Sequence, residues 1–311
     1  MERLSDNKII AVIQKTRLEN LIARYNTQGQ AKFYIESHGG DFNDYISEHE
    51  TYKNAVNSSL SILGRFGRVT TVEREYIPNF IFGENDLVVV IGRDGLMVNV
   101  MKYLTTQKLI GVNPDPKRWD GVLLPFSDKD LQQIVPETFK DIRPVKSVTL
   151  AYCKLSDGQI IYGVNDLFIG QRTHASARYR LSLEGKTEMQ SSSGIIVSTG
   201  LGRTGWLKSI IAGAQGIGKF CGKEADYSIS NDFSWNSDYL YFTVREPFPS
   251  NSTGTDIIFG KISKNSDMII ESCMPENGII FSDGIENDCL EFNSGTTASI
   301  GVSDRTGNLI M

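Results

Sequence analysis

A short aliphatic run that ends in a glycine-flanked aspartate is the first feature of this sequence able to carry chemistry. Leu87–Ile91 is a run of five aliphatic residues, which indicates a strand buried on both faces, and Gly92, Arg93, Asp94 and Gly95 follow it directly. A helical pattern comes next, so the turn combines backbone that an anion can approach closely with the unpaired N–H groups of a helix start. Open α/β folds bind ligands at this edge of the sheet, so we expect a phosphorylated ligand here. The alternative is that Asp94 only caps the helix.

An adjacent amide and carboxylate form the second candidate. Asn165 and Asp166 stand directly before the apolar run Leu167–Ile169. The amide both donates and accepts hydrogen bonds, whereas an ionised carboxylate only accepts, so the pair has the groups needed to hold the hydroxyls of a ribose. Asn-Asp is also a common turn pair, and an ordinary turn is the alternative interpretation.

The third candidate is a glycine-rich segment, Ser193–Trp206, which reads as a strand, a turn and the start of a helix. Such a turn can lay backbone N–H groups and hydroxyls against a phosphate or a base, with Trp206 available to pack on a flat ring. The alternative is a tight strand-to-helix connection with a tryptophan in the core. A further segment, Gly213–Phe220, has P-loop spacing, but Phe220 stands where that loop has its magnesium-binding serine or threonine, so we do not expect a P-loop.

Length and composition bound the class of protein. The chain has 311 residues and a mass of 34.6 kDa, and domains of roughly 100–200 residues predict two. No apolar run approaches the ~18 residues of a membrane span. With 32 basic and 37 acidic residues the net charge is -5, which argues against nonspecific nucleic-acid binding. The first residues show neither a signal-peptide nor a transit-peptide pattern, so we expect a cytoplasmic protein.

The cysteines do not predict a metal site or disulfides. They are far apart in the sequence, form no C-x-x-C pair and do not cluster with the three histidines. We expect free thiols in a reducing compartment. The four cysteines are Cys153, Cys221, Cys273 and Cys289.

The hydrophobic pattern changes character along the chain. Residues 1–125 alternate strand-like and helix-like segments, which predicts a doubly wound α/β lobe. Residues 126–311 are dominated by short β-type runs separated by turn residues, which predicts a β-sandwich-like lobe with one helix near 205–214. We expect a cleft between the lobes and a loosely held end at Ser303–Met311.

In this order and at these intervals, the candidate segments resemble the NAD kinase family, which shares a Gly-Gly-Asp-Gly loop with the diacylglycerol-kinase and phosphofructokinase superfamily. The resemblance spans most of the chain and is closest to the divergent mitochondrial-type NAD kinases. It is carried by Ile110–Pro116, Asn165–Gly170, Ser192–Gly194, Val244–Pro247 and Glu291–Gly295. It implies an N-terminal α/β lobe, a C-terminal β-rich lobe, an active site between them, and a homodimer or higher homo-oligomer.

The resemblance also implies roles for individual residues. Asp94 would be the general base that takes the proton from the adenosine 2′-hydroxyl of NAD as that oxygen attacks the γ-phosphate of magnesium-ATP, giving NADP. Gly92, Arg93 and Gly95 would form the loop that binds the ATP phosphates. The implied NAD-binding residues are Asn165 and Asp166 at the ribose and nicotinamide end, Ser193, and Thr204, Gly205, Trp206 and Ser209 on the adenine side.

Some residues depart from the family pattern. Arg93 replaces its second glycine, Leu96 its usual threonine or serine, and Leu201 and Arg203 its small or hydroxylated residues. The Arg93 guanidinium would either bind phosphate or obstruct the loop by its bulk. Two alternatives to an NAD kinase therefore stay open: a catalytically silent NAD- or NADP-binding protein, and a superfamily kinase that acts on another nucleoside, sugar or lipid hydroxyl.

Overall fold

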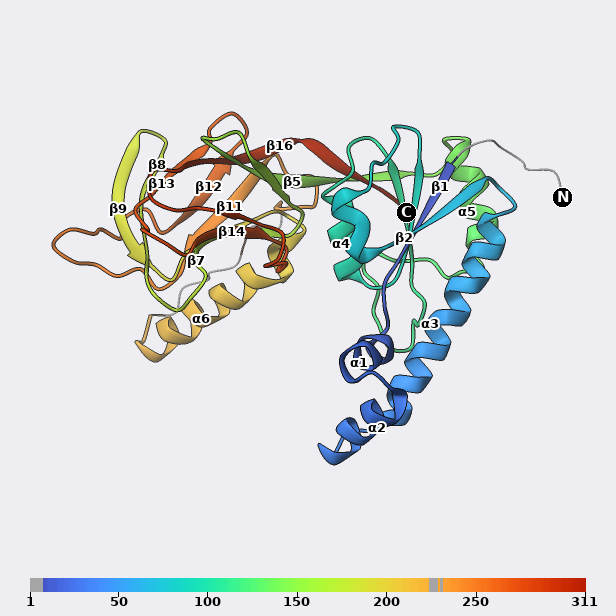
Figure 1. The fold of residues 1–311 in the computed structure, drawn as a ribbon. Coiled ribbons are helices and arrows are strands. Elements are labelled where there is room, and N and C mark those ends of the chain that lie inside the picture. Colours follow the sequence, from blue (N-terminus) through green and yellow to red (C-terminus); the bar gives the residue numbers. More distant parts are fainter. Residues whose placement is uncertain (1–7, 224–228, 230–231) are drawn as a thin grey trace. The chain divides into compact units, whose positions relative to one another are not determined.

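The computed structural model describes residues 8–223, 229 and 232–311, and the chain divides into two units (Figure 1). The first unit combines the chain up to Lys146 with Gly307–Met311, and the second is Ser147–Thr306. The predicted boundary lay between residues 125 and 126. The structure instead places 126–146 in the first unit, because the helix in this stretch packs into the hydrophobic core of that unit.

The N-terminal unit is built on a parallel sheet. Its elements are β1 (Lys8–Ile13), α1 (Arg17–Tyr25), α2 (Gln28–Ser37), α3 (Phe42–Leu63), β2 (Arg68–Glu73), the 3₁₀ helix η1 (Arg74–Asn79), β3 (Leu87–Ile91), α4 (Asp94–Met101), β4 (Lys108–Val112) and α5 (Leu131–Phe139). The strand order is β2-β1-β3-β4, with every neighbouring pair parallel. The end of β16 (Thr297–Ile310) adds a further parallel strand, with Asn308 opposite Lys108 and Leu309 opposite Leu109.

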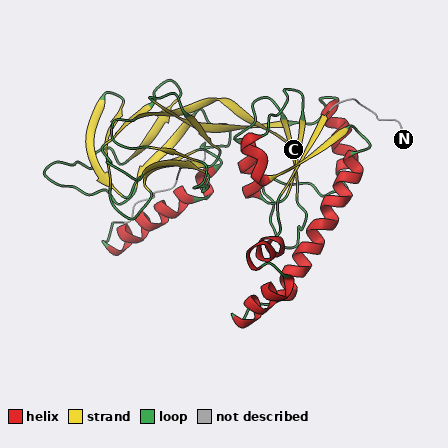
Figure 2. Ribbon diagram, in the orientation of Figure 1, coloured by secondary structure: helices red, strands yellow, loops and turns green. Residues whose placement is uncertain are grey.

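Helices cover both faces of this sheet, as expected for a doubly wound layer (Figure 2). Leu87, Val89 and Ile91 of β3 share one core with side chains of α3 and α5. Val88 and Val90 point to the opposite face, where α4 lies. The predicted strand at Leu87–Ile91 is confirmed, and every residue of it is buried, which is why the run is aliphatic throughout.

The C-terminal unit is a sandwich of two mainly antiparallel sheets. Its elements are β5 (Val145–Leu155), β6 (Ile160–Gly163), β7 (Asp166–Gln171), β8 (Ala177–Leu183), β9 (Lys186–Ser192), β10 (Ile195–Ser198), the 3₁₀ helix η2 (Gly202–Thr204), α6 (Trp206–Phe220), β11 (Tyr239–Val244), β12 (Phe259–Ser263), β13 (Met268–Ser272), β14 (Gly278–Ser282), β15 (Cys289–Glu291) and most of β16. One sheet has the order β16-β13-β8-β9, with β5 paired with β16 and β6 paired with β5, and the other has the order β12-β11-β10-β7-β14-β15.

Side chains from both sheets meet in the core of the sandwich. Alternate residues of β7 and β10 pack against alternate residues of β8 and β13, for example Leu167 and Ile169 in the same cluster as Leu181 and Ile270. The outer face of the second sheet carries α6, whose Ile210 packs with residues of β7 and β14. The predicted helix near 205–214 is therefore confirmed, and it extends to Phe220.

The C-terminal segment differs from its prediction. Ser303–Met311 was expected to be a loosely held end, and this is wrong: β16 runs to Ile310 and pairs with β4 at its end. Leu309 and Ile310 are fully buried. Residues 303–308 are polar and show no strand pattern in the sequence. This part of the strand is stabilised by pairing with segments distant in the sequence, which no local pattern indicates.

The helices also bear on the question of a membrane span. Within residues 8–223, 229 and 232–311, no helix is both long enough and apolar enough to cross a membrane. The 22-residue helix α3 contains charged residues, among them Asp44, Glu48 and Lys53, which form ion pairs.

Candidate functional site

The predicted site residues are divided between the two units. Gly92, Arg93, Asp94 and Gly95 belong to the N-terminal unit, and all the residues predicted to bind NAD belong to the C-terminal unit. Each set is described within its own unit below.

Asp94 lies at the carboxyl edge of the parallel sheet, where β3 ends and α4 begins. Its side chain is partly exposed, and its Oδ1 accepts a hydrogen bond of 2.7 Å from the backbone N–H of Leu123. Arg93 is the N-cap residue of α4, and its side chain accepts no hydrogen bond from the N–H groups at the helix start. Among the described residues, nothing accepts a hydrogen bond from the N–H groups of Asp94 and Gly95. The carboxylate thus stands beside a helix start whose donors are available to an anion.

The loop that donates to Asp94 is held close to β4 by a glycine. A Cβ on Gly111 would lie 2.3 Å from the Leu123 carbonyl oxygen and 2.8 Å from the Leu124 Cα. Only glycine permits this approach, so Gly111 sets the position of the Leu123 N–H. The site depends on this loop, and the one sequence signal for it was a glycine inside the otherwise aliphatic strand Lys108–Val112.

A buried asparagine shapes the same loop. Asn113 directly follows β4, and its Nδ2 donates to the Trp119 carbonyl oxygen at 2.8 Å. Its Oδ1 accepts a hydrogen bond from the Asp115 N–H at 3.1 Å. Asn113 therefore orders the turn that carries Trp119, and the Arg93 guanidinium lies over the Trp119 ring at 4.8 Å.

These contacts give structural reasons for two of the departures from the family pattern. Leu96 is 1% exposed, and a Cβ on Gly92 would lie 2.8 Å from its Cδ2. Leu96 is therefore part of the packing beneath the loop and not a surface ligand. The Arg93 side chain packs on Trp119, a cation–π contact that holds the guanidinium next to the start of α4.

The strand order puts a topological switch point between β1 and β3. The chain leaves β1 toward β2 on one side and leaves β3 toward β4 on the other, and the crevice at such a point is where open α/β sheets bind ligands.

Tyr52 of α3 joins the ends of β1 and β3. Its hydroxyl accepts from the Gln14 N–H at 2.9 Å and donates to the Ile91 carbonyl oxygen at 3.0 Å. Burial raises the pKa of Tyr52 to about 12, so the hydroxyl stays protonated.

Replacing Tyr52 by phenylalanine is expected to lower the free energy of unfolding by about 1–3 kcal/mol, because a partly buried N–H and a buried carbonyl lose their hydrogen bonds to the hydroxyl. Urea unfolding followed by circular dichroism measures the change. Tyr45→Phe is the matched control on the same helix: Tyr45 packs against Arg17 through its ring, and a change within about 0.5 kcal/mol is expected there. Equal losses in the two variants would contradict the bridging role of Tyr52.

In the C-terminal unit the structure brings the second and third candidate segments together. The Thr199 hydroxyl donates to the Val164 carbonyl oxygen at 2.5 Å, and the Thr199 N–H donates to the Asn165 carbonyl oxygen at 2.9 Å. A Cβ on Gly202 would lie 2.0 Å from that same Asn165 oxygen. The glycine-rich turn therefore holds the Asn165–Asp166 segment by its carbonyl groups.

The N–H groups of that segment are held by a residue that the sequence analysis missed. Asp283, in the turn after β14, accepts hydrogen bonds from the N–H groups of Val164 at 3.1 Å, Asn165 at 2.6 Å and Asp166 at 3.3 Å. The Asp283 N–H in turn donates to the Asp166 carbonyl oxygen at 3.0 Å. The sequence showed Asp283-Gly284 only as a turn pair, and nothing in it connected this pair with residues more than a hundred positions earlier.

The electrostatics of Asp166 are unusual. The residue is buried, with 8% of its surface exposed. Burial, followed by the nearby charge of Asp283, raises the pKa of Asp166 to about 7.

The remaining predicted NAD-binding residues lie at different places in the unit. Trp206 begins α6 and stacks on Phe168 with ring centroids 5.7 Å apart, while the Arg245 guanidinium lies over its ring at 5.2 Å. Thr204, Gly205 and Ser209 are exposed at the start of the same helix. Ser193 lies beyond the other end of β10, since Ser198 at the near end pairs with Asp166. The structure thus does not bring Ser193 to the Asn165–Asp166 segment.

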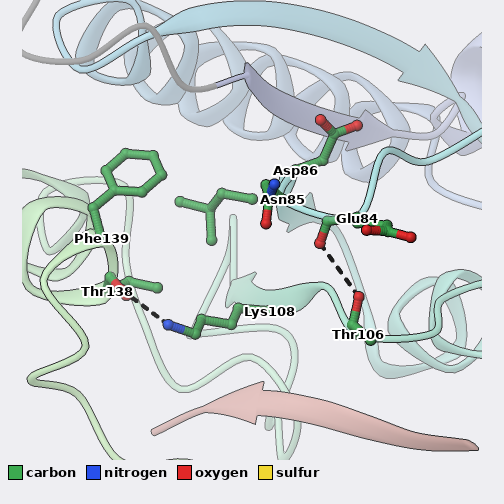
Figure 3. A pocket seen from close by; sticks show the side chains of 8 residues that line it. Glu84, Asn85, Asp86, Thr106, Lys108, Thr138 and Phe139 are labelled. Carbon is green, nitrogen blue, oxygen red and sulfur yellow. Dashed lines mark hydrogen bonds between the residues drawn. The ribbon is translucent and has the colours of Figure 1, made fainter.

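A hollow of about 570 Å³ lies at the opposite, amino edge of the parallel sheet, where β3 and β4 begin (Figure 3). Its polar groups bind one another: Lys108 donates to the Thr138 carbonyl oxygen at 3.3 Å, and Thr106 to the Glu84 carbonyl oxygen at 3.3 Å. It contains no residue of the predicted site. Its hydrogen bonds connect neighbouring turns, and none of its lining residues is Asp94 or another predicted site residue.

The described residues contain no group of three or more histidine, cysteine, aspartate or glutamate side chains that would hold a metal ion. Magnesium is commonly bound by one or two carboxylates together with water and substrate phosphate oxygens.

Comparison with known proteins bears on this fold. No family model matches the chain, and no curated protein matches its sequence. Among solved structures, an NAD kinase from Archaeoglobus fulgidus in complex with ATP is 16% identical, with a TM-score of 0.56 over 98% of this chain and 93% of that one. Yeast NADH kinase complexed with NADH is 13% identical, with a TM-score of 0.58 over 98% of this chain and 84% of that one.

The chain is therefore an α/β plus β-sandwich protein with an aspartate at the carboxyl edge of its parallel sheet. Its fold is that of the NAD and NADH kinases over nearly its whole length. The predicted fold class, an α/β lobe followed by a β-rich lobe, is confirmed.

Proposed function

We propose that this protein is an NAD kinase-like phosphotransferase, which transfers the γ-phosphate of ATP to the adenosine 2′-hydroxyl of NAD and so produces NADP. The observation that carries the proposal is the position of Asp94, a partly exposed carboxylate beside an uncapped helix start at the carboxyl edge of the parallel sheet. This geometry occurs in a chain with the fold of NAD and NADH kinases.

Each group has a chemical role in this proposal. Asp94 takes the proton of the attacking hydroxyl, and the N–H groups of Asp94 and Gly95 stabilise the phosphate oxygens together with the backbone near Gly92. Magnesium, bound with ATP, neutralises phosphate charge. We assign the dinucleotide contacts to Asn165, Asp166, Thr204, Gly205, Trp206 and Ser209, whereas Ser193 lies apart from Asn165 and Asp166.

Arg93 is expected to assist phosphate binding, because its contact with Trp119 holds the guanidinium beside the start of α4. Arg93→Ala should raise the KM for ATP by roughly 3–10-fold with little change in kcat, as expected for lost charge-assisted hydrogen bonds that do not change in the transition state. The matched control is Arg24→Ala, since Arg24 lies over Tyr25 at 5.4 Å in the same unit but on another helix. A faster reaction in Arg93→Ala would instead identify the arginine as an obstruction.

The decisive experiment incubates the purified chain with magnesium-ATP or polyphosphate as donor and NAD or NADH as acceptor, and detects NADP or NADPH with an NADP-specific dehydrogenase. Formation of either product supports the proposal, and the preferred pair identifies donor and acceptor. Tight dinucleotide binding in calorimetry without product would favour a silent binding protein. Phosphorylation of a different hydroxyl alone would favour another kinase of the superfamily.

A further inference from the structure

Asp166 and Asp283 are two carboxyl groups whose surroundings differ, and the charge of Asp283 acts on Asp166. Asp283 accepts hydrogen bonds from three successive N–H groups, the shortest 2.6 Å from Asn165. Such donors favour the ionised form of a carboxyl group. Asp283 also has a φ of 56°, a left-handed conformation that is uncommon for residues other than glycine.

Asp166 lacks comparable partners. Asp166 is buried, with only 8% of its surface exposed. In the described part of its unit, no N–H group and no cation hydrogen-bonds to its side chain. It is opposite Ser198 of β10, which is uncharged, and on the β14 side it meets Asp283. Asp283 is the charged group whose field reaches Asp166, and that field opposes a second negative charge.

We infer that Asp166 binds the dinucleotide as a neutral carboxylic acid that donates an O–H hydrogen bond, and that Asp283 is the positioning residue that keeps it in this form. The inference rests on the proposed function. An ionised carboxylate accepts hydrogen bonds from ribose hydroxyls, whereas a neutral acid recognises an acceptor, such as the carbonyl oxygen of a carboxamide or a ring nitrogen of a base. The Asp166 site therefore selects a ligand with an uncharged acceptor at this position.

The sign of the pH dependence follows from the raised pKa. The competent, protonated form predominates below the pKa of about 7 and is lost above it. The association constant for NAD should accordingly be level below about pH 6 and fall by up to roughly tenfold per pH unit above about pH 7.5.

Titration calorimetry of the full chain with NAD between about pH 5.5 and 8.5 tests this dependence. Asp166→Asn should bind within a few-fold of the wild-type maximum and with little pH dependence, because its amide donates at every pH. Asp283→Asn keeps an oxygen that accepts the three N–H groups but removes the charge, so the fall in affinity should move to lower pH. Asp157→Asn is the control, since Asp157 is an exposed turn carboxyl that binds Gln159, and it should leave the profile unchanged.

A wild-type affinity that is flat or rises with pH, together with weakened binding by Asp166→Asn, would mean that Asp166 acts as an ionised acceptor and would overturn the inference. Carbon-13 NMR titration of the Asp166 carboxyl, assigned with Asp166→Asn, decides the protonation state without any ligand and without the Asp283 variant. An apparent pKa below about 5 would refute it.

The outcomes for the two proposals are distinguishable. NAD binding with the expected pH response but no phosphoryl transfer would reject the kinase proposal and leave the role of Asp166 intact. Phosphoryl transfer with a pH-independent NAD affinity would reject only the role of Asp166.

Discussion

Replacing Asp94 by asparagine is expected to lower kcat by roughly 10²–10⁴-fold, the contribution typical of a positioned general base. The amide oxygen of asparagine can still accept the Leu123 N–H, which donates to Asp94 at 2.7 Å, so the loop should keep its position. The dinucleotide affinity should change by less than about tenfold, because one uncharged hydrogen bond is worth about 1 kcal/mol. The coupled NADP assay gives kcat, and calorimetry gives the affinity.

A matched carboxyl in the same unit separates this chemical effect from a general change of charge. Glu84 is exposed at the amino edge of the parallel sheet, where it lines the hollow of Figure 3. Glu84→Gln should leave kcat unchanged within about twofold. Wild-type rates in Asp94→Asn would exclude Asp94 as the base and leave the proposed reaction without a proton acceptor.

The second large effect is expected for Gly111→Ala. The added Cβ would lie 2.3 Å from the Leu123 carbonyl oxygen and 2.5 Å from the Met97 Cε. The methionine can move, but the Leu123 oxygen belongs to the backbone, so the loop must shift away from β4. We expect a loss of about 2–3 kcal/mol in the free energy of unfolding, as for other overpacked cores.

The same shift should reduce turnover, because it withdraws the Leu123 N–H from Asp94. We expect kcat to fall by about tenfold at a temperature where the variant is folded, which corresponds to about 1.4 kcal/mol of lost positioning. Gly29→Ala is the control: a Cβ on Gly29, within α2, would meet nothing within 4 Å. It should be neutral or stabilising by up to about 1 kcal/mol. Similar losses in both variants would show that the packing against Leu123 does not matter.

The two candidate segments, one in each unit, are held by the same kind of contact. In each, a backbone segment with a candidate carboxylate is held by contacts from elements distant in the sequence, the 121–124 loop at Asp94 and the Asp283 turn at Asp166. Because the backbone at both carboxyl groups is already held, it does not have to be ordered when a ligand binds, which lowers the entropic cost of binding.

The sequence alone identified the Leu87–Ile91 strand, the Asp94 turn and the division into an α/β and a β-rich part. These features are local: a central parallel strand must be aliphatic on both faces, and a helix start after a glycine turn has its own pattern. The resemblance to NAD kinases could be recognised from the sequence because the shared motifs are short and contiguous.

The tertiary structure alone decided how these residues are held and charged. The Asn165 N–H bond to Asp283 joins residues 118 positions apart, and the Tyr52 bond to Ile91 joins residues 39 apart. No local pattern encodes such pairs, since they depend on which strands become neighbours. The raised pKa of Asp166 has the same origin, because burial and the field of Asp283 exist only once β7 and the turn after β14 lie together.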